Sequence, residues 1–490
     1  MAGRQHKYTR KEIEGILDAC AGRTLGEVDS AGVFHQVDPE SNSDYKPMVK
    51  GIIGDVVEQS IFGYPADSDQ RPDLLIDGVE VELKSTALRD SKKDAGWEAK
   101  EPMSITAVSI DTIADEEFET SNFWHKAQRM LIVYYYYETE RVKLSIEYRG
   151  FHLIDYQFHT FEADEVETLR NDWRLVHDFI EEAQATLGGK ELEDRYSMLG
   201  SELRPKLMFI DTSPKYPNNP RFRLKRTTVT TIARKKFGDV RYMPLPKAYT
   251  SLEAVDAELR RKAATYKGRT VAEIARSLGV RPGAKNLSEQ LFVRMFGATG
   301  KINSIELFVK AGIVVKTVNI LKGKPGEATK FYAVDLDEFL DPDLTFENSE
   351  MFRYFNESQF VFMVTEESRA HAHPEEKRFL GFKRLTMPDE VIDSELRSCF
   401  DNARDLIAGG KLEFVAEIDP ETGAPKPNKK SGAVRGAPNF QKSSDCQIFL
   451  KGGGADARSR IEFMGVPMYR QSVWWGKDLT RRLLDATPWI

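Results

Sequence analysis

The sequence has few cysteines, no long apolar run and no excess of positive charge. Its 490 residues include three cysteines, Cys20, Cys399 and Cys446, whose wide separation and odd number indicate neither a disulfide framework nor a zinc cluster. No apolar run approaches the ~20 residues that a membrane-spanning helix requires. The first residues also lack the apolar centre of a secretion signal. We therefore expect a cytoplasmic protein with reduced thiols and no membrane partner.

The composition is that of a folded protein with more than one domain. Hydrophobic residues make up 41% of the chain and charged residues 30%, which is typical of globular proteins. The length predicts about two to four domains. A net charge of −7 argues against non-specific coating of nucleic acid. It does not exclude a local basic groove, because only the face that docks has to attract phosphates.

The most informative segment runs from residue 50 to residue 85. It places Glu58 on an amphipathic helical run and Asp73 at the start of a strand, and it places Glu82 and Lys84 on one face of the next strand. Carboxylates hold hard divalent cations, and a lysine beside them orients or activates an attacking water. This combination of groups predicts the hydrolysis of a phosphodiester.

The residues around the charged positions predict a β-hairpin. Pro72 favours the start of a strand, and Asp77-Gly78 is a strong two-residue turn signal. Residues 79–84 alternate between apolar and charged side chains, so one strand face is fully charged. The same local pattern also fits an exposed hairpin with solvated charges. The rest of the chain favours the catalytic interpretation.

Several segments of the first half recur in the second half in the same order. Gly22–Val28 (GRTLGEV) returns as Gly268–Ile274 (GRTVAEI), and Val81–Thr86 (VELKST) returns as Ile313–Val318 (IVVKTV). Phe62-Gly63 and the segment from Glu119 to Phe123 also have counterparts, at Phe296-Gly297 and at 348–352. The sequence therefore predicts two copies of one domain, with residues 1–240 as the first domain, 241–262 as a linker and 263–490 as the second domain.

The second copy lacks the carboxylates of the first. Val314 replaces Glu82, while the positions of Asp73 and Glu58 fall near Ile305 and Phe292; Lys316 retains the lysine. A copy without carboxylates cannot hold the cation. We therefore expect the first domain to cut and the second to bind DNA or regulate. If the charges were only surface decoration, their joint loss in an otherwise similar copy would be hard to explain.

On these residues the chain resembles the MutH-like branch of the PD-(D/E)xK nucleases, in particular the two-domain GATC-cutting type II restriction endonucleases. The resemblance involves the Gly22 to Glu27 segment, residues 50–58, Pro72-Asp73 with Val81–Lys84, and Glu119 to Ser121 with His125-Lys126. It implies a mixed α/β (α+β) fold with two tandem domains, each a mixed sheet flanked by helices. It also implies a cleft for duplex DNA.

The resemblance also implies roles for individual residues. Asp73 and Glu82 would hold Mg²⁺, Lys84 would lie next to the attacking water, and Glu58 would be an accessory acid for a second cation or a water. Lys50, Gly51 and Lys126 match family positions close to DNA. One departure is the spacing, because Leu74 to Val81 separate Asp73 from Glu82 and make the hairpin longer than is usual in the family.

Further DNA contacts are expected from loops late in each half. In the first half these are Arg204, Lys206 and Lys225, and in the second half the candidate is Lys451, which precedes three glycines that let the backbone approach DNA. The alternative is that these are ordinary flexible loops. Residues 227–237 predict a helix whose basic end lies along a phosphate backbone.

These observations predict a type II restriction endonuclease that makes Mg²⁺-dependent double-strand cuts and leaves 5′ phosphates. The GATC target comes from the resemblance only. The alternatives are a repair endonuclease that nicks one strand, as MutH does, and a catalytically silent DNA-binding protein. The expected partners are double-stranded DNA, a second copy of the chain on DNA, and a separately encoded DNA methyltransferase.

Overall fold

The computed structural model describes residues 6–65, 71–91, 96–138, 144–284, 286–342, 344–428, 432–454 and 459–490. The chain divides into two compact units. The first comprises Met1–Ala254 and Asn303–Ala311, and the second comprises Val255–Ile302 and Gly312–Ile490. Among the described helices, none is both long and apolar enough to cross a membrane.

The first unit is built on a mixed sheet with the order β1-β2-β3-β6-β7, and β4 pairs with the far end of β3. The central pair, β3 and β6, is parallel. β2 runs antiparallel to β3 and parallel to β1, and β7 runs antiparallel to β6. A separate small sheet has the order β5-β9-β8. The strands are β1 (His6–Tyr8), β2 (Leu74–Ile76), β3 (Val79–Asp90), β4 (Trp97–Ala99), β5 (Met103–Ala107), β6 (Met130–Tyr136), β7 (Leu153–His159), β8 (Ile210–Asp211) and β9 (Arg221–Leu224).

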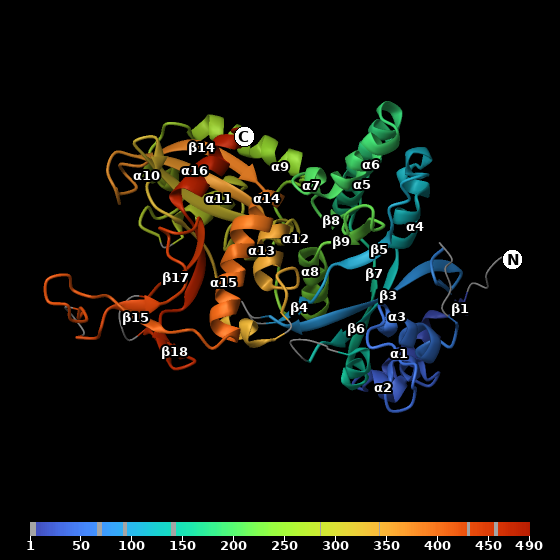
Figure 1. The fold of residues 1–490 in the computed structure, drawn as a ribbon. Helices are drawn as coiled ribbons and strands as arrows, with labels where there is room; N and C mark the ends of the chain where they lie inside the picture. Colours follow the sequence, from blue (N-terminus) through green and yellow to red (C-terminus); the bar gives the residue numbers. More distant parts are fainter. Residues whose placement is uncertain are drawn as a thin grey trace. The chain divides into compact units, whose positions relative to one another are not determined.

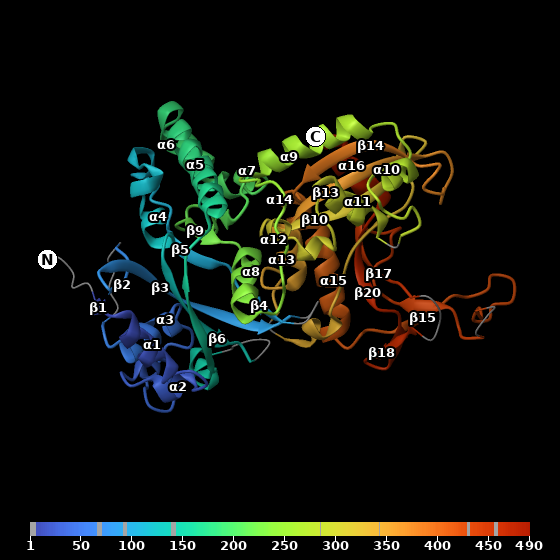
Figure 2. The same ribbon diagram turned by 180° about the vertical axis from the view of Figure 1, so that it is seen from behind.

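Helices α1, α2 and α3 of the first unit lie close together in both views (Figures 1 and 2). Their apolar residues form one core cluster with Leu74, Val81, Leu83 and Leu131 of the sheet. The longest helix, α5, carries the buried residues Trp173, Val176 and Ile180. The helices are α1 (Arg10–Asp18), α2 (Leu25–Val28), α3 (Ile52–Asp55), α4 (Asn122–Ala127), α5 (Ala163–Thr186), α6 (Gly189–Ser197), α7 (Leu199–Leu203), α8 (Arg226–Phe237) and α12 (Glu306–Lys310).

The second unit has a mixed sheet with the order β11-β10-β13-β14 and a smaller sheet with the order β12-β20-β17. Here too the central pair, β10 and β13, is parallel, and β14 runs antiparallel to β13. Two short hairpins, β15-β16 and β18-β19, lie away from the main sheet (Figure 1). The strands are β10 (Ile313–Leu321), β11 (Lys324–Pro325), β12 (Thr329–Ala333), β13 (Gln359–Glu367), β14 (Arg378–Leu385), β15 (Phe414–Ala416), β16 (Gly436–Pro438), β17 (Ile448–Gly452), β18 (Ile461–Phe463), β19 (Val466–Met468) and β20 (Gln471–Trp475).

The core of the second unit is rich in aromatic side chains. Trp475 is fully buried and stacks on Phe355, with ring centroids 5.9 Å apart. Phe360 and Phe362 of β13 contact the same tryptophan. The helices are α9 (Leu252–Tyr266, which begins at the end of the first unit), α10 (Val271–Ser277), α11 (Leu287–Met295), α13 (Glu350–Glu357), α14 (Asp389–Val391), α15 (Arg397–Ala408) and α16 (Lys477–Ala486).

The repeated sequence GRT adopts the same local structure in both units. Thr24 and Thr270 are helix N-caps, and each forms a capping box with the glutamate three residues later. The preceding glycines, Gly22 and Gly268, have positive φ values of 75° and 81°. Each glycine N–H donates over 2.8 Å to the carbonyl of a strand residue, Leu153 in β7 and Phe379 in β14. The predicted mixed α/β fold class is confirmed.

The unit boundaries differ from the predicted domain boundaries. The predicted linker, 241–262, contains the first turns of α9, and residues Asn303–Ala311 belong to the first unit. Met243 forms a parallel bridge with Ile305, and the Thr227 hydroxyl donates to the Lys310 carbonyl over 2.8 Å. These contacts join residues far apart in sequence, so the local composition carried no sign of them.

Candidate nuclease site

The predicted hairpin forms as expected and positions Asp73. Asp77 and Gly78 both have positive φ, 49° and 80°, which is the backbone that a type I′ turn requires. Asp73 immediately precedes β2 rather than opening it. Its Oδ2 accepts a hydrogen bond from the Leu83 backbone N–H at 2.9 Å. The carboxylate of Asp73 is therefore held against β3 between the positions of Glu82 and Lys84.

Glu82 is the most buried charged group of the hairpin, with 2% of its surface exposed. Lys84 Nζ lies 2.5 Å from Glu82 Oε1 and 3.4 Å from the Ile105 carbonyl. Lys126 Nζ lies 3.2 Å from both Glu82 oxygens and is directed as a hydrogen-bond donor toward Oε1. The carboxylate is thus paired with two ammonium groups, one of which comes from a different element of the fold.

The short helix α4 brings Lys126 to this position. Ser121 caps the helix by accepting the Trp124 N–H at 3.1 Å, and its hydroxyl donates to the Phe118 carbonyl. His125, the preceding residue, lies 3.0 Å from Glu80 on β3. The prediction that Lys126 contacts DNA did not include its pairing with Glu82, because that contact joins residues 44 positions apart.

Glu58 lies on a π-helical turn, Val56–Ile61, that continues directly from α3. Such turns are rare and are frequently found at functional sites. The Glu58 side chain is half-buried, and its backbone carbonyl accepts the Tyr64 N–H at 3.1 Å. Tyr64 senses the charges of Asp73, Glu58 and Glu82. Tyr64 is therefore within electrostatic range of all three predicted carboxylates.

The Asp73 carboxyl titrates well above its ordinary range. Burial, and then the charge of Glu82, raise its pKa to about 6, while the Leu83 N–H and the two lysines oppose the shift. A bound divalent cation would oppose both effects and favour the ionised carboxylate.

The donor set fits a hard divalent cation. Glu82 Oε2 is buried and has no hydrogen-bond partner among the described residues, although Lys126 is near it. It therefore retains a lone pair, beside the Asp73 carboxylate, for a further ligand. Mg²⁺ prefers carboxylate oxygens and water, so Asp73, Glu82 and Glu58 are the residues that would hold it.

The other predicted DNA contacts lie in different environments. Lys50 and Gly51 are exposed at the start of α3, where Gly51 has a φ of 84°. Lys206 is exposed, and Arg204 is half-buried after α7. In the second unit, the Lys451 ammonium is exposed and lies 5.0 Å from the Trp474 ring centre. Lys50, Lys206 and Lys451 are accessible to a phosphate backbone.

Lys225 requires a correction. It is 5% exposed, and its ammonium donates to the Leu207 carbonyl at 2.6 Å. Its charge also acts on Asp172, which is fully buried. Lys225 therefore stabilises the interior of the first unit and cannot also reach DNA. Sequence alone missed this because a lysine after a basic strand is usually solvated.

The basic end of α8 is also neutralised within the first unit. Arg234 is 7% exposed and donates to the Trp97 carbonyl at 2.6 Å. Lys235 and Lys236 pair with Glu306 and Asp155 at 2.8 and 2.9 Å. Arg234 is therefore held in the interior, while Lys235 and Lys236 are exposed and form ion pairs on the surface of the first unit. That this helix lies along a phosphate backbone stays a prediction.

The corresponding strand pair of the second unit has a different chemistry. In the register of β10 with β13, Val314 pairs with Phe360 and Lys316 with Phe362, as Glu82 pairs with Met130 and Lys84 with Ile132. Lys316 contacts the Phe331 carbonyl at 3.4 Å, and burial lowers its pKa to about 8. This lysine has no carboxylate on its own strand face to pair with.

The hairpin that holds Asp73 also has no counterpart among the described strands of the second unit. There β11 pairs with Ile320 and Leu321 at the far end of β10, as β4 pairs with the far end of β3. Among the described strands of this unit, none corresponds to β2. Ile305, the predicted counterpart of Asp73, belongs to the first unit, and Phe292 is fully buried in α11.

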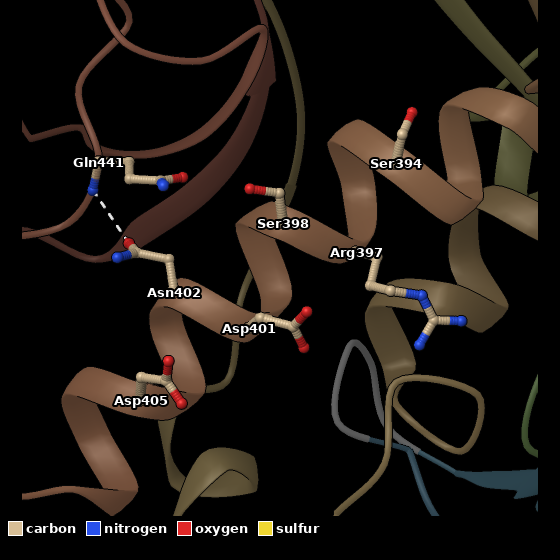
Figure 3. A pocket seen from close by; sticks show the side chains of 7 residues that line it. All are labelled: Ser394, Arg397, Ser398, Asp401, Asn402, Asp405 and Gln441. Carbon is tan, nitrogen blue, oxygen red and sulfur yellow. Dashed lines mark hydrogen bonds between the residues drawn. The ribbon is translucent and has the colours of Figure 1, made fainter.

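A pocket of about 370 Å³ lies on α15 of the second unit (Figure 3). Gln441 donates its backbone N–H to Asn402 Oδ1 at 3.0 Å across it, and Arg397 pairs with Glu347 at 2.6 Å. None of the predicted site residues lines this pocket. Its lining is Ser394, Arg397, Ser398, Asp401, Asn402, Asp405 and Gln441.

Two comparisons with known proteins find similar sequences. Residues 62–172 match the sequence profile of the family described as DNA mismatch repair enzyme MutH. The matched segment contains Asp73, Glu82, Lys84 and Lys126. The chain contains a MutH-like nuclease domain. In this MutH-like domain, the buried carboxylate and its two lysines come from the hairpin strand β3 and from α4.

A relative with a similar length extends the match beyond the MutH-like domain. The chain is 26% identical over 405 residues to the type II restriction enzyme Sau3AI of Staphylococcus aureus. This alignment covers 76% of the present chain and 78% of the relative. The likeness therefore reaches well into the second unit. Both comparisons support a restriction-type nuclease that acts on DNA.

Proposed function

We propose that this protein is a type II restriction endonuclease that uses Mg²⁺ to cut both strands of DNA at GATC, leaving 5′ phosphates. The observation that carries the proposal is the Glu82 carboxylate, which is buried between Lys84 and Lys126 and keeps one oxygen without a hydrogen bond. The Leu83 N–H, next to Glu82 in the chain, donates to the Asp73 carboxylate and holds it beside this site. The GATC target rests on the resemblance to GATC-cutting enzymes.

The roles of the chain's own groups follow from their chemistry. Asp73 and Glu82 hold the cation, and Glu58 holds a second cation or a water. Mg²⁺, when bound, supplies Lewis-acid stabilisation of the charge that develops on the scissile phosphate. Lys84 orients the attacking water and favours its ionised form, since its ammonium is fixed by Glu82 and the Ile105 carbonyl. Lys126 adds a positive charge where the phosphate binds.

The second unit binds DNA or regulates the first in this proposal. Its sheet order and capping box resemble those of the first unit, while Val314 replaces the buried carboxylate and the β2 hairpin has no counterpart among its described strands. The two units are therefore proposed to be copies of one domain that have diverged in chemistry. Lys451, exposed beside Trp474, is its proposed DNA contact.

The test is digestion of unmethylated plasmid by the full chain in Mg²⁺, with a chelator control, followed by sequencing of the fragment ends. We expect discrete Mg²⁺-dependent fragments that end at GATC and carry 5′ phosphates. Nicked circles alone would support a strand-nicking repair enzyme instead. Intact plasmid that is nevertheless retarded on a gel would contradict the proposal and favour a DNA-binding protein.

The proposal extends to the partners and location of the enzyme. A cytoplasmic restriction enzyme requires a methyltransferase, encoded separately, that protects the host sites. Two copies of the chain would meet on DNA if one catalytic domain serves each strand. Sedimentation with and without a GATC duplex in Ca²⁺ tests this assembly, because a dimer on DNA doubles the protein mass per duplex.

A further inference from the structure

Tyr64 contacts the backbone of Glu58 and has no role in the proposed reaction. It follows the π-helical turn, and its backbone N–H donates to the Glu58 carbonyl at 3.1 Å. Its ring stacks on His6, with centroids 3.8 Å apart and planes inclined by 11°. His6 pairs in β1 with Leu74 of β2, the residue that follows Asp73. Tyr64 is therefore packed between the backbone of Glu58 and the strand start beside Asp73.

The hydroxyl of Tyr64 is unusual because it is buried and has no hydrogen-bond partner among the described residues. The whole residue is 6% exposed. A buried hydroxyl without a partner destabilises a fold and calls for an explanation. Tyr8, its neighbour, shows the ordinary arrangement, since its hydroxyl donates to the Phe62 carbonyl at 2.6 Å.

The surroundings of the Tyr64 hydroxyl make it a hydrogen-bond donor. A phenol is protonated at neutral pH and can donate a hydrogen bond. Burial, and then the charges of Asp73 and Glu58, raise its pKa further. The groups whose charges it senses are acceptors. Metal ligands are commonly oriented by a second layer of hydrogen-bonding residues, and these residues affect cation affinity strongly.

We propose that Tyr64 is a positioning residue of the cation site, whose hydroxyl donates a hydrogen bond to the Asp73 carboxylate or to a cation-bound water beside it. This inference rests on the proposed function, because it takes Asp73, Glu82 and Glu58 as the cation ligands. Among the described residues of the cation-free protein the hydroxyl has no partner, and it gains one when the site is loaded. A tyrosine with only a packing role would show no such dependence.

The variant Tyr64→Phe tests this, because it removes one oxygen and keeps the stacked ring. Calorimetric titration of the full chain with Mn²⁺, without DNA, should show a dissociation constant raised about tenfold. In single-turnover cleavage, the Mg²⁺ concentration at half-maximal rate should rise similarly, with the maximal rate recovered at saturating Mg²⁺. The cation-free variant should melt at the parental temperature or above it, since a buried unpaired hydroxyl has been removed.

Tyr8→Phe is the matched control. It also removes one phenolic oxygen near the site, but that oxygen is bonded to the Phe62 carbonyl. We expect a lower melting temperature and an unchanged Mn²⁺ dissociation constant. Weaker Mn²⁺ binding without a loss of stability identifies a positioning hydroxyl, whereas a loss of stability with unchanged Mn²⁺ binding identifies a structural one.

The inference is overturned if Tyr64→Phe binds Mn²⁺ and responds to Mg²⁺ like the parent, or if the parent shows no saturable Mn²⁺ binding. Failure of the proposed function looks different. In that case the parent binds Mn²⁺ but leaves DNA intact, and the comparison of the two dissociation constants still decides the role of Tyr64. A Glu82→Gln variant that binds Mn²⁺ normally would place the cation elsewhere and would also overturn the inference.

Discussion

Lys84 Nζ lies 2.5 Å from Glu82 Oε1, two residues earlier on the same strand, and both side chains are largely buried. Alternation along a strand places them on one face, and the fold then covers that face. Removing one partner of such a pair leaves an uncompensated buried charge, which destabilises the fold. Its position beside Asp73 indicates that the pair serves chemistry, and the following changes test that assignment.

Glu82→Gln and Lys84→Met should each reduce DNA cleavage by about 10²- to 10³-fold or more, because each removes a charge that acts on the reacting phosphate. Binding of a GATC duplex in Ca²⁺ should be largely retained, as measured by gel retardation. Glu80→Gln is the control, since Glu80 is on the same face of β3 but pairs with His125. Parental cleavage by either site variant would show that the assigned site is wrong.

Cation affinity should depend on pH through Asp73. Its pKa of about 6 means that the carboxyl is increasingly protonated below pH 6, and a protonated carboxyl is a poor ligand. We expect Mn²⁺ affinity to be nearly constant above pH 7 and to fall about tenfold for each unit below pH 6. Calorimetry between pH 5 and 8 checks this. A flat profile would contradict the raised pKa.

The Asp73 carboxyl should also affect the stability of the cation-free protein. Stability should fall as pH rises, whereas cation affinity should increase. Because its folded-state pKa lies above the ordinary 3.8, the cation-free protein binds more protons than the unfolded chain between these values. This contribution therefore lowers the free energy of unfolding as pH rises from about 4 to 6. Asp73→Asn should stabilise the cation-free protein at pH 7 by on the order of 1 to 2 kcal/mol. Denaturant unfolding of this variant, with Asp77→Asn as control, measures the effect.

Replacement of Lys316, the counterpart of Lys84, tests whether the second unit takes part in cleavage. Burial lowers its pKa from 10.5 to about 8, so its ammonium destabilises the folded state below pH 8, and this cost declines as pH rises toward 10.5. Lys316→Met should therefore raise the melting temperature at pH 7 and leave cleavage unchanged. Lys84→Met should abolish cleavage. Loss of cleavage in Lys316→Met, with its fold intact, would mean that the second unit participates in the chemistry.

Lys225 and Lys206 are both cationic residues late in the first unit, and they should behave differently. Lys225→Met should destabilise the protein by about 1.5 to 3 kcal/mol, because it removes the buried ammonium that donates to the Leu207 carbonyl and whose charge favours the ionised Asp172. Lys206→Ala should leave the melting temperature unchanged, since Lys206 is exposed, and weaken DNA binding with a smaller dependence on salt. Thermal unfolding and salt-dependent gel retardation measure the two effects.

The local features of the site could be predicted from the sequence. The Asp77-Gly78 turn, the alternation along β3 and the threonine caps at Thr24 and Thr270 each depend on residues within a few positions of one another. Backbone sterics, side-chain alternation and capping hydrogen bonds operate at that range. The repeat was also visible, because duplicated segments keep their order. These signals placed Glu82 and Lys84 on one strand face.

Only the tertiary structure decided which charges meet. The pairing of Lys126 with Glu82 joins β3 to α4, and the stacking of Tyr64 on His6 joins the π-helical turn to β1. Lys225 resembles a DNA contact in sequence but lies in the interior. Such contacts are set by how strands and helices pack, and each ionisable group acquires its protonation state from neighbours distant in sequence. The sequence by itself therefore determined the local geometry of the site, and packing decided which groups pair there and how deeply they are buried.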